Sequence, residues 1–259
     1  MNQVSKKAFT VALFSIPMAL LHWSCGSEEP NEGTSSDGDT DNDVDGDVDG
    51  GADSDSNPDS DGDSNDYFPM EVGDYWIYKE SSPSGEIELK YSVTDKVKKN
   101  FGTAVGEREV FVVENTFDEN NERRIQFIED DGVRAVRHFH EVYDLDGNLT
   151  KTRLFVPGFL RLDRAKLSVG LEWTETVKRT TDTKDGSAPR LDVVAYEYKV
   201  LSLDQQVTIK GKTYFCYTFQ RHDEVDHEDK VYWYAPDIGK VREITGGKEE
   251  LLIESNYLE

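Results

Sequence analysis

The sequence predicts an all-β fold. We expect a curved antiparallel sheet, as a half-barrel, barrel or sandwich of about 12 strands, preceded by a disordered acidic tether. Two observations support this. From residue 67 onward, runs with strand-like alternation are separated by turn residues, with no convincing amphipathic helix, and the order of these runs is repeated once, so that two tandem halves of about six strands are expected.

Composition shows that only part of the chain enters a core. The 259 residues carry a formal charge of -24 and are only 36% apolar, which is low for a chain folded from end to end. The negative charge argues against a nucleic-acid binder, because phosphates would be repelled. Two cysteines allow no disulfide framework, and no Cys and His spacing predicts a structural zinc site.

Residues 1–25 have the order of a signal peptide: two lysines, then an apolar run over residues 8–21 that is too short to span a bilayer. The run is followed by Cys25, with the small Ser24 before it. This arrangement resembles the lipobox of bacterial lipoproteins, although His22 stands where that family usually has Leu. The resemblance implies that Cys25 is lipidated and anchors the chain to a membrane. Ordinary signal cleavage beside an incidental cysteine is the alternative.

Residues 26–66 are predicted to form a disordered tether. They contain thirteen Asp, three Glu, seven Gly and seven Ser, with no Lys, Arg or aromatic residue. Such a segment cannot bury enough apolar surface to offset its chain entropy, and its like charges repel. Most of the acidity lies here, because the signal carries +2, the tether -16 and residues 67–259 only -10.

One calcium-like spacing occurs within the tether. Its alternate carboxylates, which suit the oxygen coordination of Ca²⁺, are Asp41, Asp43, Asp45 and Asp49. The twelfth position from Asp41 is Ala52 and not Glu, which excludes an EF-hand. Because Asp occupies nearly every second position, composition alone explains the match, and a solvated spacer is favoured over a weak calcium site.

Residues 67–259 are predicted to form the β domain. The expected strands are Glu86 to Lys98, Glu107 to Phe117, Arg123 to Glu129, Val133 to Tyr143, Leu191 to Leu203 and Lys212 to Gln220. Hairpin turns are expected at Ser84-Gly85, Asp131-Gly132, Asp146-Gly147-Asn148, Asp185-Gly186 and Gly246-Gly247. The run from Tyr214 to Phe219 is bulky on both faces, so a second sheet, a rolled-over edge or a bound apolar ligand must cover it.

The internal duplication is marked by two Gly-x-x-Trp motifs. Gly73 and Trp76 are matched 97 positions later by Gly170 and Trp173, and similar hairpins follow each pair. This predicts pseudo-repeats at about residues 67–163 and 164–259. Each Gly is expected to bend the chain before a strand, so that the Trp covers the end of the core.

Two segments, 67–78 and 233–241, resemble the beginning and end of all-β domains with no assigned activity in bacterial envelope lipoproteins. The resemblance implies a curved sheet similar to that of periplasmic lipoprotein carriers. It also implies a location in the bacterial cell envelope, as an outer-membrane lipoprotein facing the periplasm or the surface. It brings no catalytic residues.

No motif for a nucleophile elbow, phosphate loop, zinc protease or dinucleotide site is present in the sequence. A predicted hairpin tip offers His222, Asp226 and His227 as weak metal ligands, with a solvated charged turn as the favoured alternative. His138 and His140 are expected to share one strand face and to pack in the structure.

These observations favour a lipid-anchored envelope lipoprotein whose β domain is a non-enzymatic binding module for a protein partner or an apolar ligand. Two alternatives stay open: a carboxylate-dependent hydrolase in the envelope, and a calcium-binding acidic spacer. No cofactor is expected apart from weakly bound Ca²⁺ in the tether. The expected partners are a membrane, through the lipid anchor, and the unknown protein or apolar ligand.

Overall fold

The computed structural model describes residues 66–116, 118 and 120–258, and these form antiparallel strands without a helix. The predicted signal segment, Cys25 and the four tether aspartates lie outside these residues. The twelve strands are β1 (Tyr75–Ser82), β2 (Gly85–Asn100), β3 (Glu107–Asn115), β4 (Arg123–Asp130), β5 (Arg134–Tyr143), β6 (Leu149–Asp163), β7 (Glu172–Asp182), β8 (Arg190–Ile209), β9 (Lys212–Asp223), β10 (Glu228–Ala235), β11 (Gly239–Thr245) and β12 (Lys248–Ser255).

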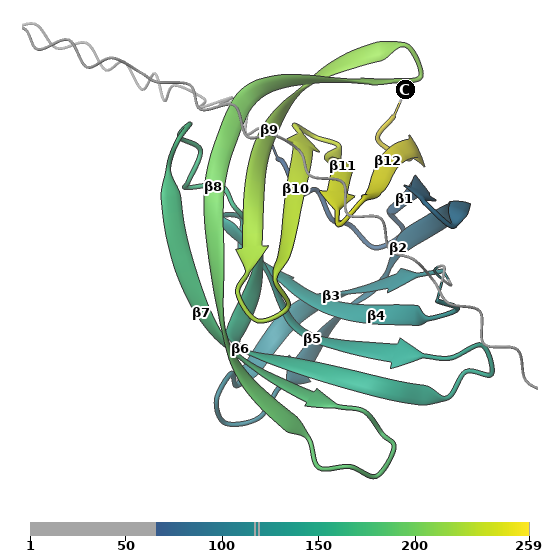
Figure 1. Cartoon of the computed structure of the whole chain (residues 1–259), viewed down its shortest axis with the longest axis vertical. Helices are drawn as coiled ribbons and strands as arrows, with labels where there is room; N and C mark the ends of the chain where they lie inside the picture. Colours follow the sequence, from purple (N-terminus) through teal and green to yellow (C-terminus); the bar gives the residue numbers. More distant parts are fainter. Residues whose placement is uncertain (1–65, 117, 119, 259) are drawn as a thin grey trace, which may run out of the picture. The chain divides into compact units, whose positions relative to one another are not determined.

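The strands form a closed barrel (Figure 1). Each strand pairs with its neighbours in the sequence, and β1 pairs with β12 to close the sheet. Closure confirms the all-β antiparallel prediction and selects the barrel among its three forms. A closed barrel has no free sheet edge, so every interior strand face is covered by the opposite wall.

The predicted turns lie at hairpin connections. Gly132, for example, has a φ of 85° between β4 and β5, a conformation that glycine adopts without strain. Asp130 and Asp131 support this turn by accepting hydrogen bonds from the backbone N–H groups of Gly132 and Val133, at 3.0 and 2.9 Å. Local turn chemistry therefore fixes where the chain reverses.

The pairing of β6 with β7 covers only part of both strands. These strands pair only from Thr152 to Val156, and beyond that point Arg134 of β5 forms an ion pair at 2.5 Å with Glu175 of β7. Gly158 lies at this bend, where an added Cβ would approach Val136 Cγ1 to 2.2 Å. The close approach of β5 requires a residue without a side chain here.

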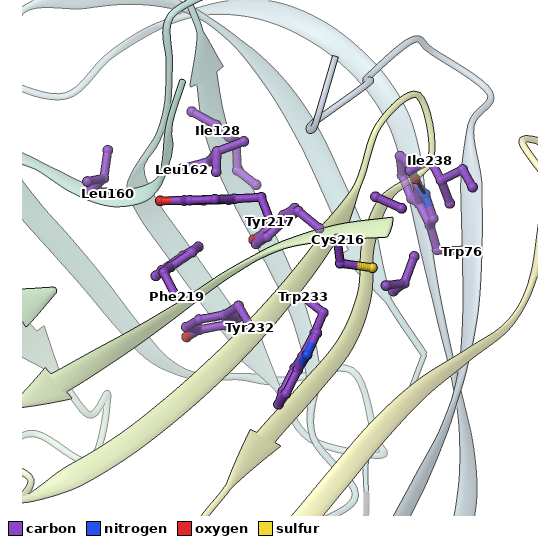
Figure 2. Packing of buried hydrophobic residues seen from close by; sticks show 14 of the residues in the cluster. Trp76, Ile128, Leu160, Leu162, Cys216, Tyr217, Phe219, Tyr232, Trp233 and Ile238 are labelled. Atoms are coloured by element: carbon purple, nitrogen blue, oxygen red, sulfur yellow. Dashed lines mark hydrogen bonds between the residues drawn. The ribbon is translucent and has the colours of Figure 1, made fainter. Parts of the chain in front are cut away.

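Aromatic rings from β9 and β10 dominate the interior. Phe219 stacks on Tyr232 and Tyr234 with ring centroids 5.0 and 5.9 Å apart. Figure 2 shows Tyr217, Phe219 and Tyr232 gathered with Leu160, Leu162 and Ile128 of the other strands. These large rings supply much of the apolar area that holds the opposite walls together.

A smaller apolar cluster is formed by residues of β3 to β6 and by the connection after β2. Phe101 from this connection packs on Phe127 and Phe139, with ring centroids 6.3 Å away in each case, and Val105 joins it. The chain thus supplies its own cover for these strands. In the run from Tyr214 to Phe219, both strand faces are buried from Cys216 onward, but Phe215 is 58% exposed and has no such cover.

Within the described ranges, no helix is long and apolar enough to cross a bilayer.

Candidate functional site

An apolar pocket lies inside the barrel beside β1, β2, β3 and β4. Its empty space is about 510 Å³, including the part open to solvent, but only about 60 Å³ admits the centre of a water molecule. The space is therefore a narrow slot that suits a thin chain or a flat ring. The residues lining it are Phe68, Pro69, Met70, Trp76, Tyr78, Tyr91, Val113, Gln126, Ile128, Arg161, Gly239 and Lys240.

Strand register places the slot's side chains. Trp76 lies opposite Tyr91 on paired strands, and Val113 lies opposite Gln126, so each pair projects to one face of the sheet. Trp76 is fixed by a 2.7 Å hydrogen bond from its Nε1 to the carbonyl oxygen of Ile238. The aromatic walls are thus held by the strands rather than by loops, which favours a preformed site.

The segment before β1 forms another part of the wall. Phe68 packs on Tyr234 with ring centroids 6.0 Å apart. Arg164 anchors the segment by donating hydrogen bonds to Asp66 Oδ1 at 2.7 Å and to the Phe68 carbonyl oxygen at 3.3 Å. The slot is therefore bounded by the residues that immediately follow the predicted tether.

A polar vestibule adjoins the slot, and Tyr91 lines both spaces. The charged residues that line it are Glu80, Asp118, Arg124, Glu228, Lys230, Glu243, Lys248 and Glu250. Lys240 from the slot donates hydrogen bonds to Glu243 at 2.7 Å and to Glu250 at 2.5 Å. An apolar slot beside a charged vestibule fits an amphipathic molecule better than a wholly apolar one.

The vestibule also holds the acids that a hydrolase would need. Burial, with Glu250 nearby, raises the pKa of Glu80, and its Oε1 is buried without a hydrogen-bond partner. Asp118 is paired with Arg124 at 2.8 Å, and Glu243 and Glu250 are bound to Lys240. Most of these acids have basic partners, so the hydrolase hypothesis keeps one candidate acid, Glu80, and stays a prediction.

The two Gly-x-x-Trp motifs form matching turns. Gly73 N–H donates to the Val93 carbonyl oxygen at 2.9 Å, and Gly170 N–H donates to that of Val200 at the same distance. Both glycines have positive φ, 104° and 81°. This equivalence supports the internal duplication, which stays a prediction.

The two tryptophans of these motifs differ in their surroundings. Trp76 stacks on Tyr257 with centroids 5.9 Å apart, and it lines the slot. Trp173 stacks on Tyr198 at 4.9 Å, beneath the Lys166 ammonium at 4.4 Å. One half of the barrel therefore uses its tryptophan at the pocket, and the other half uses it in packing.

The histidine-rich hairpin joins β9 to β10, and its ionisable groups have separate partners. His222 Nδ1 lies 2.9 Å from Asp229, while Asp226 accepts a hydrogen bond from Arg179 at 2.7 Å. His227 is exposed, with a φ of 50°. Within the residues described, no group of three or more His, Cys, Asp or Glu side chains is placed to hold a metal ion.

His138 and His140 do not share a surface, so that expectation is wrong. The β5 register shifts between Arg137 and Phe139, and the two rings enter different clusters. His138 packs on Phe101 at 5.4 Å and lies 2.7 Å from Glu129, whereas His140 packs on Phe155 at 5.8 Å. An extra residue in one strand breaks the alternation on which the prediction depended.

Cys216 is a buried free thiol, as its place in an aromatic strand indicates. Burial raises its pKa to about 12. Since the thiolate is the reactive form, we expect the folded protein to react with a disulfide reagent such as Ellman's at least about 100-fold more slowly than the unfolded protein. A Cys25→Ser variant isolates this thiol for the measurement, and rapid reaction in the native state would contradict its burial.

The sequence matches no described protein family and no curated protein. Among solved structures, a protein described as exported with a YmcC-like fold, from Bacteroides fragilis, is 12% identical with a TM-score of 0.41, covering 73% of this chain and 98% of its own. A protein described as a lipoprotein from Parabacteroides distasonis has the same identity and coverages with a TM-score of 0.34.

A third structure is that of the hypothetical lipoprotein YmcC from Escherichia coli. It is 12% identical with a TM-score of 0.29, covering 72% of this chain and 90% of its own.

The sequence did not point to the slot residues as a set. The bulky run that it singled out, Tyr214 to Phe219, lines no part of the slot. The choice between a bound ligand and chain packing depends on which strands face each other. Arg161 was missed in the same way, because a charged residue within a strand is ordinarily expected at a solvated face. Alternation could not place it either, because the register of β6 shifts at Arg161, between Leu160 and Leu162.

Proposed function

We propose that this protein is a lipid-anchored envelope lipoprotein whose barrel binds an amphipathic or apolar small molecule in the interior slot. The observation that carries the proposal is the slot itself: a narrow, aromatic-lined space, partly open to solvent, beside a charged vestibule. Ligand sites are typically lined by apolar side chains with a few placed polar groups, as this slot is. A small molecule is therefore favoured over a protein partner as the occupant.

The proposed location rests on the lipobox resemblance at Cys25 and on the acidic residues that follow it. A lipid anchor would hold the chain at the outer membrane, facing the periplasm or the surface, and an extended tether of 41 residues would give the barrel reach. In this arrangement the barrel samples molecules near the membrane without being embedded in it.

Filling the slot should abolish binding. In the full-length chain, N-phenyl-1-naphthylamine, a neutral apolar dye, should become fluorescent on binding, and Val113→Phe should weaken its affinity at least about tenfold, since the added ring occupies the narrow space. Val193→Phe, on an exposed position that is 61% accessible, is the matched control and should bind as the parent does. Circular dichroism establishes that both variants are folded. Dye binding that is unchanged in folded Val113→Phe would refute the slot as the site.

The anchor is tested separately with the two cysteines. In a bacterial host, Cys25→Ser should abolish incorporation of radioactive palmitate and release the protein from the membrane fraction, because Cys25 is the cysteine at the end of the predicted signal segment. Cys216→Ser, in the buried β9 thiol, should leave both properties intact. Continued labelling of Cys25→Ser would place the lipid elsewhere or exclude it.

A further inference from the structure

Several arginines of the barrel form no ion pair within the described residues, and three of them lie close enough to act on one another. Arg137 on β5, Arg161 on β6 and Arg221 on β9 form no ion pair within the described part of the chain, although each has a buried Nε without a hydrogen-bond partner. We call these three residues the interior arginine cluster. Buried polar groups in folded proteins are almost always hydrogen-bonded, so three charged groups with buried, unpaired Nε atoms require an explanation.

The contacts of the cluster are aromatic or neutral. Arg221 is only 6% exposed and lies over the rings of Phe159 and Tyr232, at 4.6 and 5.3 Å. Arg137 lies over the same Phe159 ring at 4.7 Å and donates a hydrogen bond to Gln126 Oε1 at 3.0 Å. Cation–π contacts orient a guanidinium but do not neutralise its charge.

Within the cluster, the charge of Arg137 is the least favourable. Burial, followed by the positive charges of Arg161 and Arg221, lowers the pKa of Arg137 well below its ordinary value. A guanidinium nevertheless keeps its proton in proteins, so the charges persist and repel. Burial opposes the charge of Arg161 and Arg221, but nearby tyrosines and Glu243 raise the pKa of both. Glu243 itself is already bound by Lys240.

The cluster also reaches the slot. Arg161 lines it directly, and Gln126, which accepts the Arg137 hydrogen bond, lines it as well. The hydroxyl group of Tyr234, which lies close enough to Arg161 to influence it, is buried without a partner. This side of the slot therefore offers several donors and a surplus of positive charge, which is the complement of an oxyanion.

We propose that the interior arginine cluster binds the oxyanion head group of the slot's ligand, a carboxylate, phosphate or sulfate whose apolar part lies among Trp76, Tyr78 and Ile128. This inference rests on the proposed function and specifies its ligand as an anionic amphiphile. The anion would supply the missing counter-charge, so binding should stabilise the barrel as well as fill it.

The test compares ligands that share a chain and differ in charge, with the full-length protein. Dodecanoate should bind at least about tenfold more tightly than dodecanol, by calorimetry and by displacement of N-phenyl-1-naphthylamine. Arg161→Met should remove this preference, so that dodecanoate and dodecanol bind to this variant with about equal affinity. Arg190→Met is the control, because it removes one positive charge from an exposed side chain, and it should keep the preference.

The melting temperature gives a second readout, and it should respond differently if Arg161 only stabilises the fold. Removing an uncompensated buried charge should leave the melting temperature of the ligand-free protein unchanged or raise it. A lowered melting temperature together with an unaltered dodecanoate preference would overturn the proposal. If Arg161→Met does not fold, Arg161→Gln makes the same comparison with a neutral polar side chain.

The remaining outcomes separate this inference from the proposed function. Dye and dodecanol binding without any preference for dodecanoate would leave the slot as a binding site and refute the anion site. No binding of dye, dodecanol or dodecanoate would refute both. Inorganic phosphate that stabilises the protein as strongly as dodecyl phosphate would mean that a free anion is the ligand, and it would refute the amphiphile.

Discussion

Replacing Lys240 with Met is expected to lower the free energy of unfolding by about 3–5 kcal/mol. The Lys240 side chain is only 10% exposed and lies between Glu243 and Glu250, which are 11% and 15% exposed. Without the ammonium group, two nearly buried carboxylates face each other without their principal partner. Urea unfolding, monitored by circular dichroism, measures the loss.

The matched control is Lys199→Met. Lys199 pairs with Glu172 at the same short distance, 2.7 Å, but the two side chains are 51% and 64% exposed. Exposed pairs contribute little, so this variant should differ from the parent by no more than about 1 kcal/mol. Equal effects of the two substitutions would contradict the view that burial makes the Lys240 network important.

The Lys240 network also predicts how the loss of unfolding free energy in Lys240→Met depends on pH. Burial alone would raise the pKa of Glu243, but Lys240 and Lys230 outweigh it, and the pKa lies well below its ordinary value of 4.5. A carboxyl group with a lowered folded pKa stabilises the fold above its ordinary pKa, and that contribution is lost as the pH falls below it. The parent should therefore lose stability below about pH 4.5. The Lys240→Met deficit should be smaller at pH 4 than at pH 7, because protonation removes the unpaired charges.

Replacing Asp74 with Ala is expected to cost about 3 kcal/mol, the second largest effect. Asp74 is 5% exposed and precedes β1, and its carboxylate accepts hydrogen bonds from three groups: the Glu71 N–H at 2.5 Å, Asn256 Nδ2 at 2.6 Å, and the Tyr257 hydroxyl. Asn256 and Tyr257 follow β12. The substitution removes one acceptor and leaves donors at both ends of the barrel chain unpaired.

The control for Asp74→Ala is Asp95→Ala. Asp95 is an exposed residue of β2 whose carboxylate accepts a local hydrogen bond from the adjacent Lys96 N–H at 2.7 Å. We expect a change of less than about 0.5 kcal/mol in urea unfolding. Similar losses for the two variants would show that the link between the β1 and β12 ends does not stabilise the barrel.

The sequence predicted the strands and their connections because both depend on local chemistry. The strand from Lys212 to Gln220 and the Asp131-Gly132 turn are visible in neighbouring residues, and both occur in the structure as expected. The pairing of β1 with β12 is different, since it joins residues such as Trp76 and Ser255 that have no local signal of each other. The sequence therefore could not distinguish a barrel from a half-barrel or a sandwich, because that choice depends on whether β1 pairs with β12.

The candidate site was less predictable than the fold for the same reason. Arg221 continues an alternation that begins with Tyr217 and Phe219, so its inward direction was available from spacing alone. The lack of an acidic partner for Arg221 could not be predicted, because any of the many acidic residues in the sequence could have been its neighbour. At β5 the local pattern was misleading. The spacing of His138 and His140 predicts a shared strand face, but the register shift between them places the two rings in different clusters.

The closing pair of strands has a consequence for the time course of folding. In a sheet whose other pairings all join sequence neighbours, the partner of β1 is the final strand, β12. During synthesis the N-terminal strands are made first. One edge of β1 therefore stays unpaired until β12 has been synthesised. Nascent chains stalled before β12 should therefore be protease-sensitive and prone to strand-to-strand association, whereas release of the last residues should end that vulnerability in one step.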